Sequence, residues 1–138
     1  MAALVITAAS VVPAANASLS TGTAGVAVTA GQVVYLDSIT GKYLLADADS
    51  ATPAARVPAG IAVNNAAVNQ ALTIQKGGSI TIGATVAPGV GYYLSATAGS
   101  IAPVGDNTTG VYPTLLGFGI STTVVALVSP FAQAGVAV

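Results

Sequence analysis

A partial internal repeat is the feature of this sequence that most limits how the chain can fold. Residues 25–41 and residues 83–99 align without a gap at a constant offset of 58, with identical residues at six of seventeen positions. The identical pairs are Gly25/Gly83, Val28/Val86, Gly31/Gly89, Tyr35/Tyr93, Leu36/Leu94 and Gly41/Gly99. Because the matches fall on glycines and a Tyr-Leu pair and never on alanine, they indicate turns and a packed strand that occur twice. A chance alignment in a biased composition is the alternative interpretation.

Short runs of Val, Ile, Thr and Tyr, separated by Gly, Pro and Asn, predict an all-β chain. Strands are expected at Leu4–Ala8, Val11–Val12, Gly25–Thr29, Gln32–Asp37, Lys42–Ala46, Gly60–Val63, Ala71–Gln75, Ser79–Ile82, Gly91–Ser95, Leu115–Ile120 and Val124–Ser129. Asp37–Lys42 and Lys76–Ser79 contain glycine and are each expected to be a hairpin turn. Gly60-Ile61 and Gly119-Ile120 are expected to occupy corresponding places.

These signals together predict a β-sandwich or β-barrel-like fold in one domain that covers residues 1–138. Two related halves are expected at about 25–75 and 83–130. Residues 1–20 are expected to form an N-terminal strand or arm, and residues 131–138 a C-terminal tail. Helical signals are weak, because the alanine-rich stretches lack an amphipathic period.

The side chains that most enzymes use are scarce. The chain contains no Cys, His or Trp, and its charged residues are three basic and four acidic ones. Ser-His-Asp and Cys-His catalysis and Cys/His zinc sites are therefore excluded. The sequence predicts a protein that is not an enzyme and has no cofactor.

Charge and hydropathy also narrow the choice of partners. With a net charge of −1 and scattered Lys and Arg, the chain lacks a patch for phosphate contacts or for a basic membrane-surface helix. Mean hydropathy is +0.82, but Gly, Pro, Ser, Thr and Asn interrupt every apolar stretch before eighteen residues. We therefore expect neither a nucleic-acid nor a membrane partner. The apolar N-terminus lacks the basic start of a signal peptide, so it is interpreted as a strand.

Two small groups of side chains are candidates for binding. Asp37, Asp47 and Asp49 offer hard oxygen ligands that suit Ca²⁺, although Asp is equally a common turn former. Lys42 and Arg56 flank them and suit either surface ion pairs or pairs between subunits.

Tyrosines form the other group. Tyr35, Tyr92, Tyr93 and Tyr112 suit an aromatic platform for sugar, or else core and interface anchors.

The low charge predicts that partners cover part of the surface. Only 5% of residues are charged, which protects a free monomer poorly against association. We expect a homo-oligomer, most simply a homotrimer, and expect both uncharged chain ends to be interface segments. The expected interface residues are Val5, Ile6, Val11, Val12, Tyr35, Tyr93, Phe131 and Val136. Removal of residues 1–12 is expected to leave the Tyr-Leu scaffold folded.

Phrases along nearly the whole chain resemble one family of structural proteins. They are Leu4–Ala9, Gly22–Gly25, Thr29–Gln32, Val34–Asp37, Ala46–Ser50, Gly60–Ala62, Gly77–Gly83, Tyr93–Ser95, Gly99–Pro103 and Ala134–Val138. Together they resemble the small Ala/Gly/Thr-rich head-decoration (cement) proteins of tailed bacteriophages. The resemblance implies a virion protein, made in the bacterial cytoplasm, that sits on the outer capsid surface, often as a trimer. It also implies that the chain clamps neighbouring major capsid subunits. It transfers no functional residue to a single position here.

Capsid decoration is therefore the first hypothesis for this chain. Another virion component, such as a tail, head–tail or fibre-base protein, is the second. A carbohydrate-binding β module that uses the tyrosines is the third.

Overall fold

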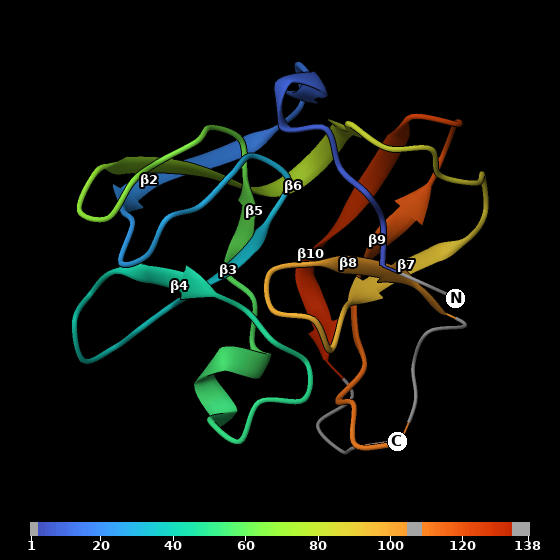
Figure 1. Ribbon diagram of the computed structural model, residues 1–138. Helices are drawn as coiled ribbons and strands as arrows, with labels where there is room; N and C mark the ends of the chain where they lie inside the picture. The colour runs from blue at the N-terminus through green and yellow to red at the C-terminus, as the bar shows by residue number, and fades with distance from the viewer. Residues whose placement is uncertain (1–2, 105–108, 134–138) are drawn as a thin grey trace.

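The chain folds almost entirely into β-strands joined by turns (Figure 1). The computed structural model describes residues 3–104 and 109–133. In chain order its elements are η1 (Ala8–Ser10), β1 (Val11–Pro13), β2 (Ser18–Thr23), β3 (Val33–Leu36), β4 (Tyr43–Leu45), η2 (Pro53–Arg56), β5 (Gly60–Ala62), β6 (Ala71–Ile82), β7 (Gly91–Leu94), β8 (Ile101–Pro103), β9 (Thr114–Gly119) and β10 (Val124–Gln133). Its antiparallel sheet is strongly curled into a half-barrel, which confirms the all-β, barrel-like fold that the sequence predicts.

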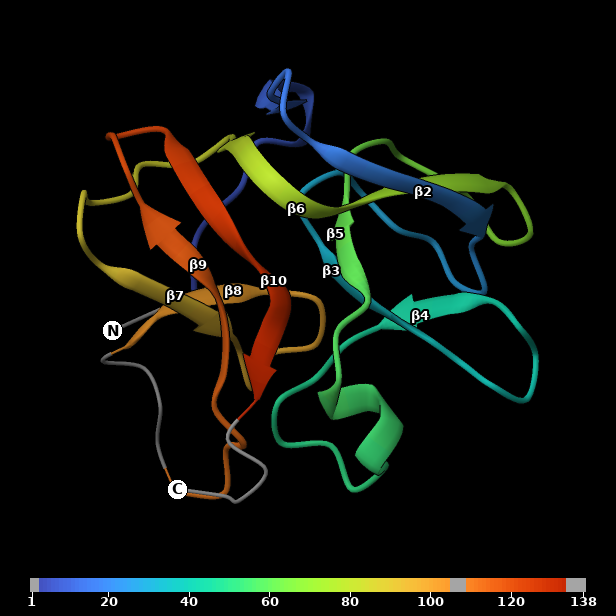
Figure 2. The same cartoon turned by 180° about the vertical axis from the view of Figure 1, so that it is seen from behind.

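The strand order has a mirrored arrangement about the middle of the sheet. It runs β4-β3-β5-β6-β10-β9-β7-β8, and β1 and β2 pair with β6 outside this path. On one side of the β6–β10 pair lie a hairpin, β3–β4, and a third strand, β5. On the other side lie a hairpin, β7–β8, and a third strand, β9. Figures 1 and 2 show these two groups side by side, from the front and from behind.

The two hairpins correspond residue by residue. A shift of 58 maps Val33–Leu36 onto Gly91–Leu94 and Tyr43–Leu45 onto Ile101–Pro103. In the first hairpin Tyr35 lies opposite Leu44. In the second, Tyr93 lies opposite Ala102, which is 58 residues further along both strands. The repeat seen in the sequence therefore coincides with two hairpins in the same register.

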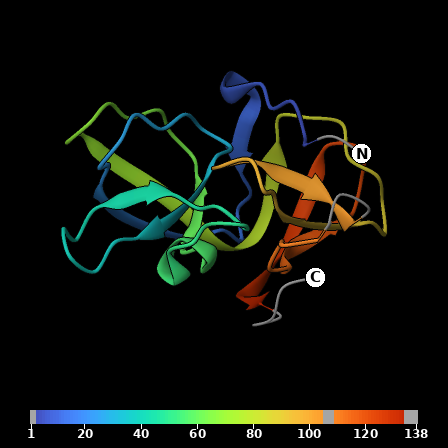
Figure 3. The ribbon, with the colours of Figure 1, turned by 60° about the horizontal axis from the view of Figure 1, so that its bottom comes forward.

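The correspondence extends to strands outside the aligned sequence block. The same shift maps β2 onto residues 76–81, which lie inside β6. β2 pairs with the first part of β6, and β10 pairs with residues 78–81 of β6. We therefore call residues 18–75 the first unit and residues 76–133 the second unit. β6 ends the first and begins the second, and it crosses between the two lobes in Figure 3.

One correspondence expected from the sequence is wrong. Gly60 pairs with Val34 in the first unit. The residue that pairs with Tyr92, the counterpart of Val34, is Gly117 and not Gly119. The offset between β5 and β9 is therefore 57, one residue less than the offset between the two hairpins.

Some local predictions also fail. Lys76–Ser79 is not a turn, since β6 continues through it as one 12-residue strand. The register of β2 against β6 shifts between Ser18 and Leu19, which pair with Gly77 and Gln75, so Lys76 is the extra residue of a bulge. A side chain at Gly78 would collide with the backbone of Asn16, which explains glycine there. Strands β2 and β8 were not predicted, and neither Leu4–Ala8 nor Gly25–Thr29 is a strand.

Buried side chains form two clusters. The smaller cluster fills the first unit and consists of Ala24, Val28, Val34, Tyr43, Ala62, Ala66, Leu72 and Ile74. The larger cluster fills the second unit and extends between the units. Its members include Ile82, Val86, Tyr92 and Ile101, the counterparts of four residues in the smaller cluster. Strand β3 serves both clusters, because Val34 points into the smaller one and Val33 and Tyr35 into the larger.

The repeated glycines allow a matched test of this packing. Gly31 and its counterpart Gly89 have φ values of +94° and +79°, and both lie at the turns that the sequence predicts. An added Cβ at Gly31 would lie 2.5 Å from Ile6 Cγ2, whereas nothing lies within 4 Å at Gly89. Gly89→Ala should therefore cost only the backbone strain, about 1–2 kcal/mol. Gly31→Ala should cost about 1–3 kcal/mol more, because the N-terminal segment must move.

Urea unfolding of the two variants beside the wild type measures this difference. Equal losses of unfolding free energy would show that residues 4–6 do not pack against Gly31.

Candidate interaction surface

The N-terminal segment is part of the folded body. The Leu4 N–H donates to the Ile101 carbonyl oxygen at 2.7 Å, and the Thr7 N–H donates to the Gly83 carbonyl oxygen at 2.8 Å. In the first unit the counterparts meet directly, since the Gly25 N–H donates to the Tyr43 carbonyl oxygen at 2.8 Å. The N-terminal segment therefore fills a gap in the second unit that the first unit closes by itself.

The interface residues expected in this segment fall into two groups. Val5 and Val12 are 90% and 53% exposed and remain available for contact. Val11 is only 7% exposed and belongs to the larger cluster, and Ile6 packs against that cluster. Removing residues 1–12 would thus open the larger cluster, contrary to the expectation from the sequence that the scaffold would stay folded.

The C-terminal residues expected at the interface are described only in part. Phe131, in β10, is partly buried and packs against the larger cluster. Val136 lies outside the described residues.

The tyrosines do not assemble into one platform. Tyr35 is 9% exposed and Tyr92 4%, and the Tyr92 hydroxyl accepts a hydrogen bond from the Ala87 N–H at 2.8 Å. Tyr112 lies under the Arg56 guanidinium, whose Cζ is 3.7 Å from the ring centroid. Tyr93 is half-buried on the outer side of β7. Burial of Tyr35 also raises its pKa, and the charge of Asp37 adds to that effect.

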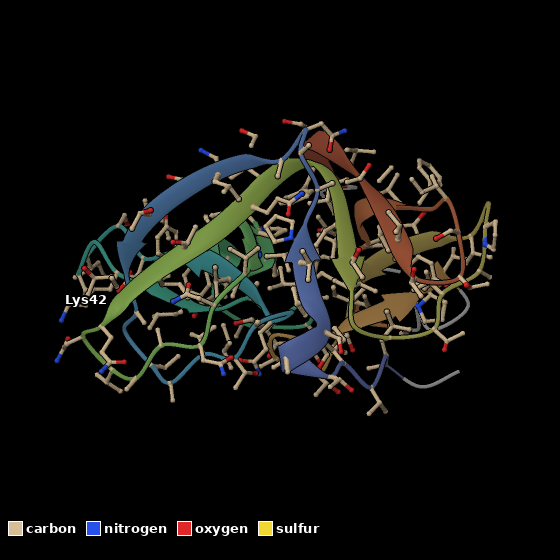
Figure 4. The ribbon with its side chains drawn as sticks, turned by 90° about the horizontal axis from the view of Figure 1, so that it is seen from above. Lys42 is labelled. Carbon is tan, nitrogen blue, oxygen red and sulfur yellow. The ribbon has the colours of Figure 1, made fainter. Side chains whose placement is uncertain are left out.

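Asp37 stabilises the β3–β4 turn. Its carboxylate accepts hydrogen bonds from the Thr40 hydroxyl at 2.8 Å and from the Ile39 N–H at 3.2 Å, and these bonds lower its pKa. Lys42 donates to the Asn69 side-chain oxygen at 2.6 Å, at the outer end of the first unit (Figure 4). These contacts are those of an ordinary Asx turn.

Asp47, like Asp37, lies at the start of a turn, in the loop before η2. Its carboxylate accepts from the Asp49 N–H at 3.4 Å. Partial burial, followed by the side-chain hydrogen bond with Asp49, raises the pKa of Asp47. Among residues 3–104 and 109–133, no three acidic residues lie close enough to hold a metal ion. The turn interpretation therefore accounts for what these aspartates do in the described structure.

Sequence analysis named only Tyr93 of a group of apolar residues on the outer side of the second unit. The side chains of Tyr93, Leu115 and Phe118 gather over Gly91 in β7, where an added Cβ would lie 3.3–3.8 Å from them. Phe118 is 44% exposed and nearby Val104 is 51% exposed. We call Gly91, Tyr93, Val104, Leu115 and Phe118 the outer face. The alternation in Gly91–Leu94 and Thr114–Gly119 was the signal that could have found it.

The first unit exposes a different feature, its hairpin turn. Ile39, at the tip, is 92% exposed, and Leu36, where β3 ends, is 51% exposed. We call Asp37–Lys42 the free turn. The candidate interaction surface thus consists of the free turn, the outer face, and the exposed N-terminal residues Val5 and Val12.

Comparison with known proteins adds no relative. No family model, curated protein or solved structure matches this chain. Within the part of the chain that the structure describes, no helix is long and apolar enough to cross a membrane.

Val11 and Val12 are neighbours in β1, and substitutions there test whether the first is buried in the core and the second is on the surface. Val11→Ala removes buried methyl groups and should lower the free energy of unfolding by about 1.5–3 kcal/mol. Val12→Ala removes exposed ones and should change it by less than about 0.5 kcal/mol. Chemical denaturation of both variants checks the contrast, and similar effects at the two positions would contradict the described packing.

The raised pKa of Asp47 predicts a pH-dependent effect. A group with a raised folded-state pKa contributes stability that is fully present below its ordinary value of 3.8 and is lost as the pH rises through the folded value. Asp47→Asn keeps the acceptor for Asp49 and should therefore raise the thermal midpoint at about pH 7 and change it little at about pH 3.

Asp37→Asn is the matched control and should have the opposite sign. The folded-state pKa of Asp37 is lowered, so its contribution is present at neutral pH and is lost as the pH falls. Loss of stability in Asp47→Asn at neutral pH would refute the assignment.

Proposed function

We propose that this chain is a non-enzymatic structural protein that binds the outside of a bacteriophage capsid and cements neighbouring major capsid subunits. It associates with copies of itself, most simply as a homotrimer. Its place would be the outer surface of the virion. Such a protein acts by buried surface area, and by binding only the mature shell it would stabilise that shell by mass action.

Exposed apolar side chains are the observation that carries this proposal. Among the described residues, large hydrophobic side chains with exposures from 44% to 92% occur on both units and on the N-terminal segment. They are Val5, Val12, Leu19, Leu36, Ile39, Val57, Val68, Val104, Phe118 and Ile120. Single exposed apolar residues are ordinary, but here only seven side chains of the sequence are charged. A surface of this kind favours a partner that covers it.

The resemblance in sequence selects the class of partner. The phrases shared with head-decoration proteins extend over nearly the whole chain, and several of them lie at the structural landmarks of the two units. Thr29–Gln32 and Val34–Asp37 belong to the first hairpin and its entry turn, and Gly77–Gly83 belongs to β6 and the residue after it. The resemblance and the surface therefore favour the same function by independent arguments.

The alternatives differ in what they require. Another virion component would have the same kind of surface but would occur in few copies at one vertex. A carbohydrate-binding module would need accessible aromatic rings, and burial of Tyr35 and Tyr92 removes two of the four candidates.

Copy number in purified particles tests the proposal. A decoration protein should occur in numbers comparable to the major capsid protein and should lie all over the shell. Quantitative mass spectrometry of virions, with the major capsid protein as internal standard, gives the ratio, and cryo-electron microscopy gives the location. A handful of copies at one vertex would favour a tail or head–tail protein, and absence from particles would exclude any virion role.

A further inference from the structure

A hairpin turn makes one of the contacts between the two units. The β7–β8 turn, Ser95–Ser100, inserts at the ends of β3 and β4. The Val33 N–H donates to the Gly99 carbonyl oxygen at 2.9 Å, and the Gly99 N–H donates to the Ala46 carbonyl oxygen at 2.7 Å. Ala98 beside them lines a depression of about 370 Å³ together with Tyr35. The second unit thus covers the first unit at this end of its hairpin.

The first unit has the same turn, but there residues 38–41 are exposed. In both turns the first residue bonds to the sixth, from the Asp37 N–H to the Lys42 carbonyl oxygen at 2.9 Å and from the Ser95 N–H to the Ser100 carbonyl oxygen at 3.0 Å. Gly41 has a φ of +70° and its counterpart Gly99 a φ of +76°. Their environments differ, since Gly99 is buried and Gly41 is exposed.

The residues beside the two turns show the same contrast. Leu94, next to the docked turn, is fully buried, whereas its counterpart Leu36 is 51% exposed. The free turn therefore has the backbone of a docking turn. In the docked turn Ala96–Ala98 are exposed and Gly99 makes the contacts, so Gly41 and the neighbouring Leu36 are the corresponding contact residues on the free turn.

The surface of the first unit that receives the docked turn has a counterpart on the second unit. Only the surface on the first unit is covered by a turn. Ala46, which accepts from Gly99, is fully buried, and its counterpart Val104 is 51% exposed. Ile61 lies opposite Val33 and is 1% exposed, whereas Phe118 lies opposite Gly91, the counterpart of Val33, and is 44% exposed. The outer face is thus the uncovered counterpart of the surface that the first unit presents to the docked turn.

We propose that the outer face of one copy receives the free turn of a second copy, in the way that the first unit receives the β7–β8 turn within the chain. The turn and the face lie at opposite ends of the molecule (Figure 1). Association is therefore head-to-tail, and it gives a ring where the rotation closes and a filament where it does not.

A second copy fits these surfaces better than an unrelated protein does. The free turn and the outer face are counterparts of two surfaces that already bind one another inside each chain. The bonds that Asp37 accepts from Thr40 and Ile39 hold the free turn in its folded form, so docking orders little new structure. Contact between Leu36 beside the turn and an apolar face also suits a surface with few charges.

Complementation between two variants tests the head-to-tail contact. Leu36→Arg spoils the contact beside the turn, Phe118→Arg spoils the face, and Val68→Arg is a control at a 54% exposed residue of the first unit. We expect the wild type and the control to sediment as the same oligomer. Each single variant should be monomeric, with a dissociation constant raised by about tenfold or more. An equimolar mixture of the two variants should form dimers and nothing larger, because each pair then has one intact junction.

Several results would overturn the proposal. A wild type that stays monomeric at high micromolar concentration would do so, as would single variants of unchanged size. A mixture that stays monomeric would exclude head-to-tail docking. Thermal midpoints equal to that of the wild type show that the variants are folded, and Leu36→Ser with Phe118→Ser replaces any arginine variant that is not.

The inference rests on the self-association in the proposed function and not on capsid binding. Binding of the same variants to purified particles is measured separately, by gel densitometry of washed particles. If copies do not dock with one another but still bind particles, this inference alone is rejected. If copies self-associate but do not bind particles, the capsid role alone is rejected.

Discussion

The hydrogen-bond ladders along β6 hold the two units together. The first part of this strand pairs with β2 and β5, and its last part pairs with β1 and β10. Near the end of the first part lies Gln75, which pairs with Leu19 and Ile61. Its side chain is fully buried and donates through Nε2 to the carbonyl oxygens of Gly77 at 3.0 Å and Ser79 at 2.8 Å. These two bonds pair carbonyl groups beside the bulge, where the regular ladder is interrupted. Both units depend on β6, because neither has a complete sheet without it.

Duplication explains why one unit is enclosed and the other is not. The second unit uses its hairpin turn to cover the first, but the chain has no third unit to cover the second. The N-terminal segment compensates in part, since it fills the gap between Gly83 and β8 and buries Val11. The outer face stays uncovered. A two-unit chain built from a self-complementary element therefore has one unused turn and one unused face, and the exposed side chains of Leu36 and Phe118 follow from this.

Much of this architecture could be predicted from the sequence, because glycine and tyrosine mark turns and strands locally. All of Gly31, Gly41, Gly89 and Gly99 have positive φ, and the two Tyr-Leu strands are where the repeat places them. The polar strand β2 could not be predicted, since its Ser and Thr residues carry no apolar alternation and depend on pairing with β6. The sequence at Gly77-Gly78 resembles a turn, because local sequence does not distinguish a turn from a bulge in a strand that another segment crosses. The outer face was missed because exposure depends on what the other unit covers.

The exposed surfaces also indicate how the chain makes contact with partners. Edge strands invite association by strand addition, and proteins commonly cover them. Here the end strands of the sheet are both engaged, since the Tyr43 carbonyl oxygen accepts from Gly25 and the Ile101 carbonyl oxygen accepts from Leu4. Leu4, which lies outside any strand, thus occupies one position on the edge of β8 that an added strand would use. The exposed apolar residues give partners side-chain surface at the free turn, on the outer face and along the N-terminal segment. Such contacts are separate in space, so one part of the surface can hold a sister copy while another holds a different protein.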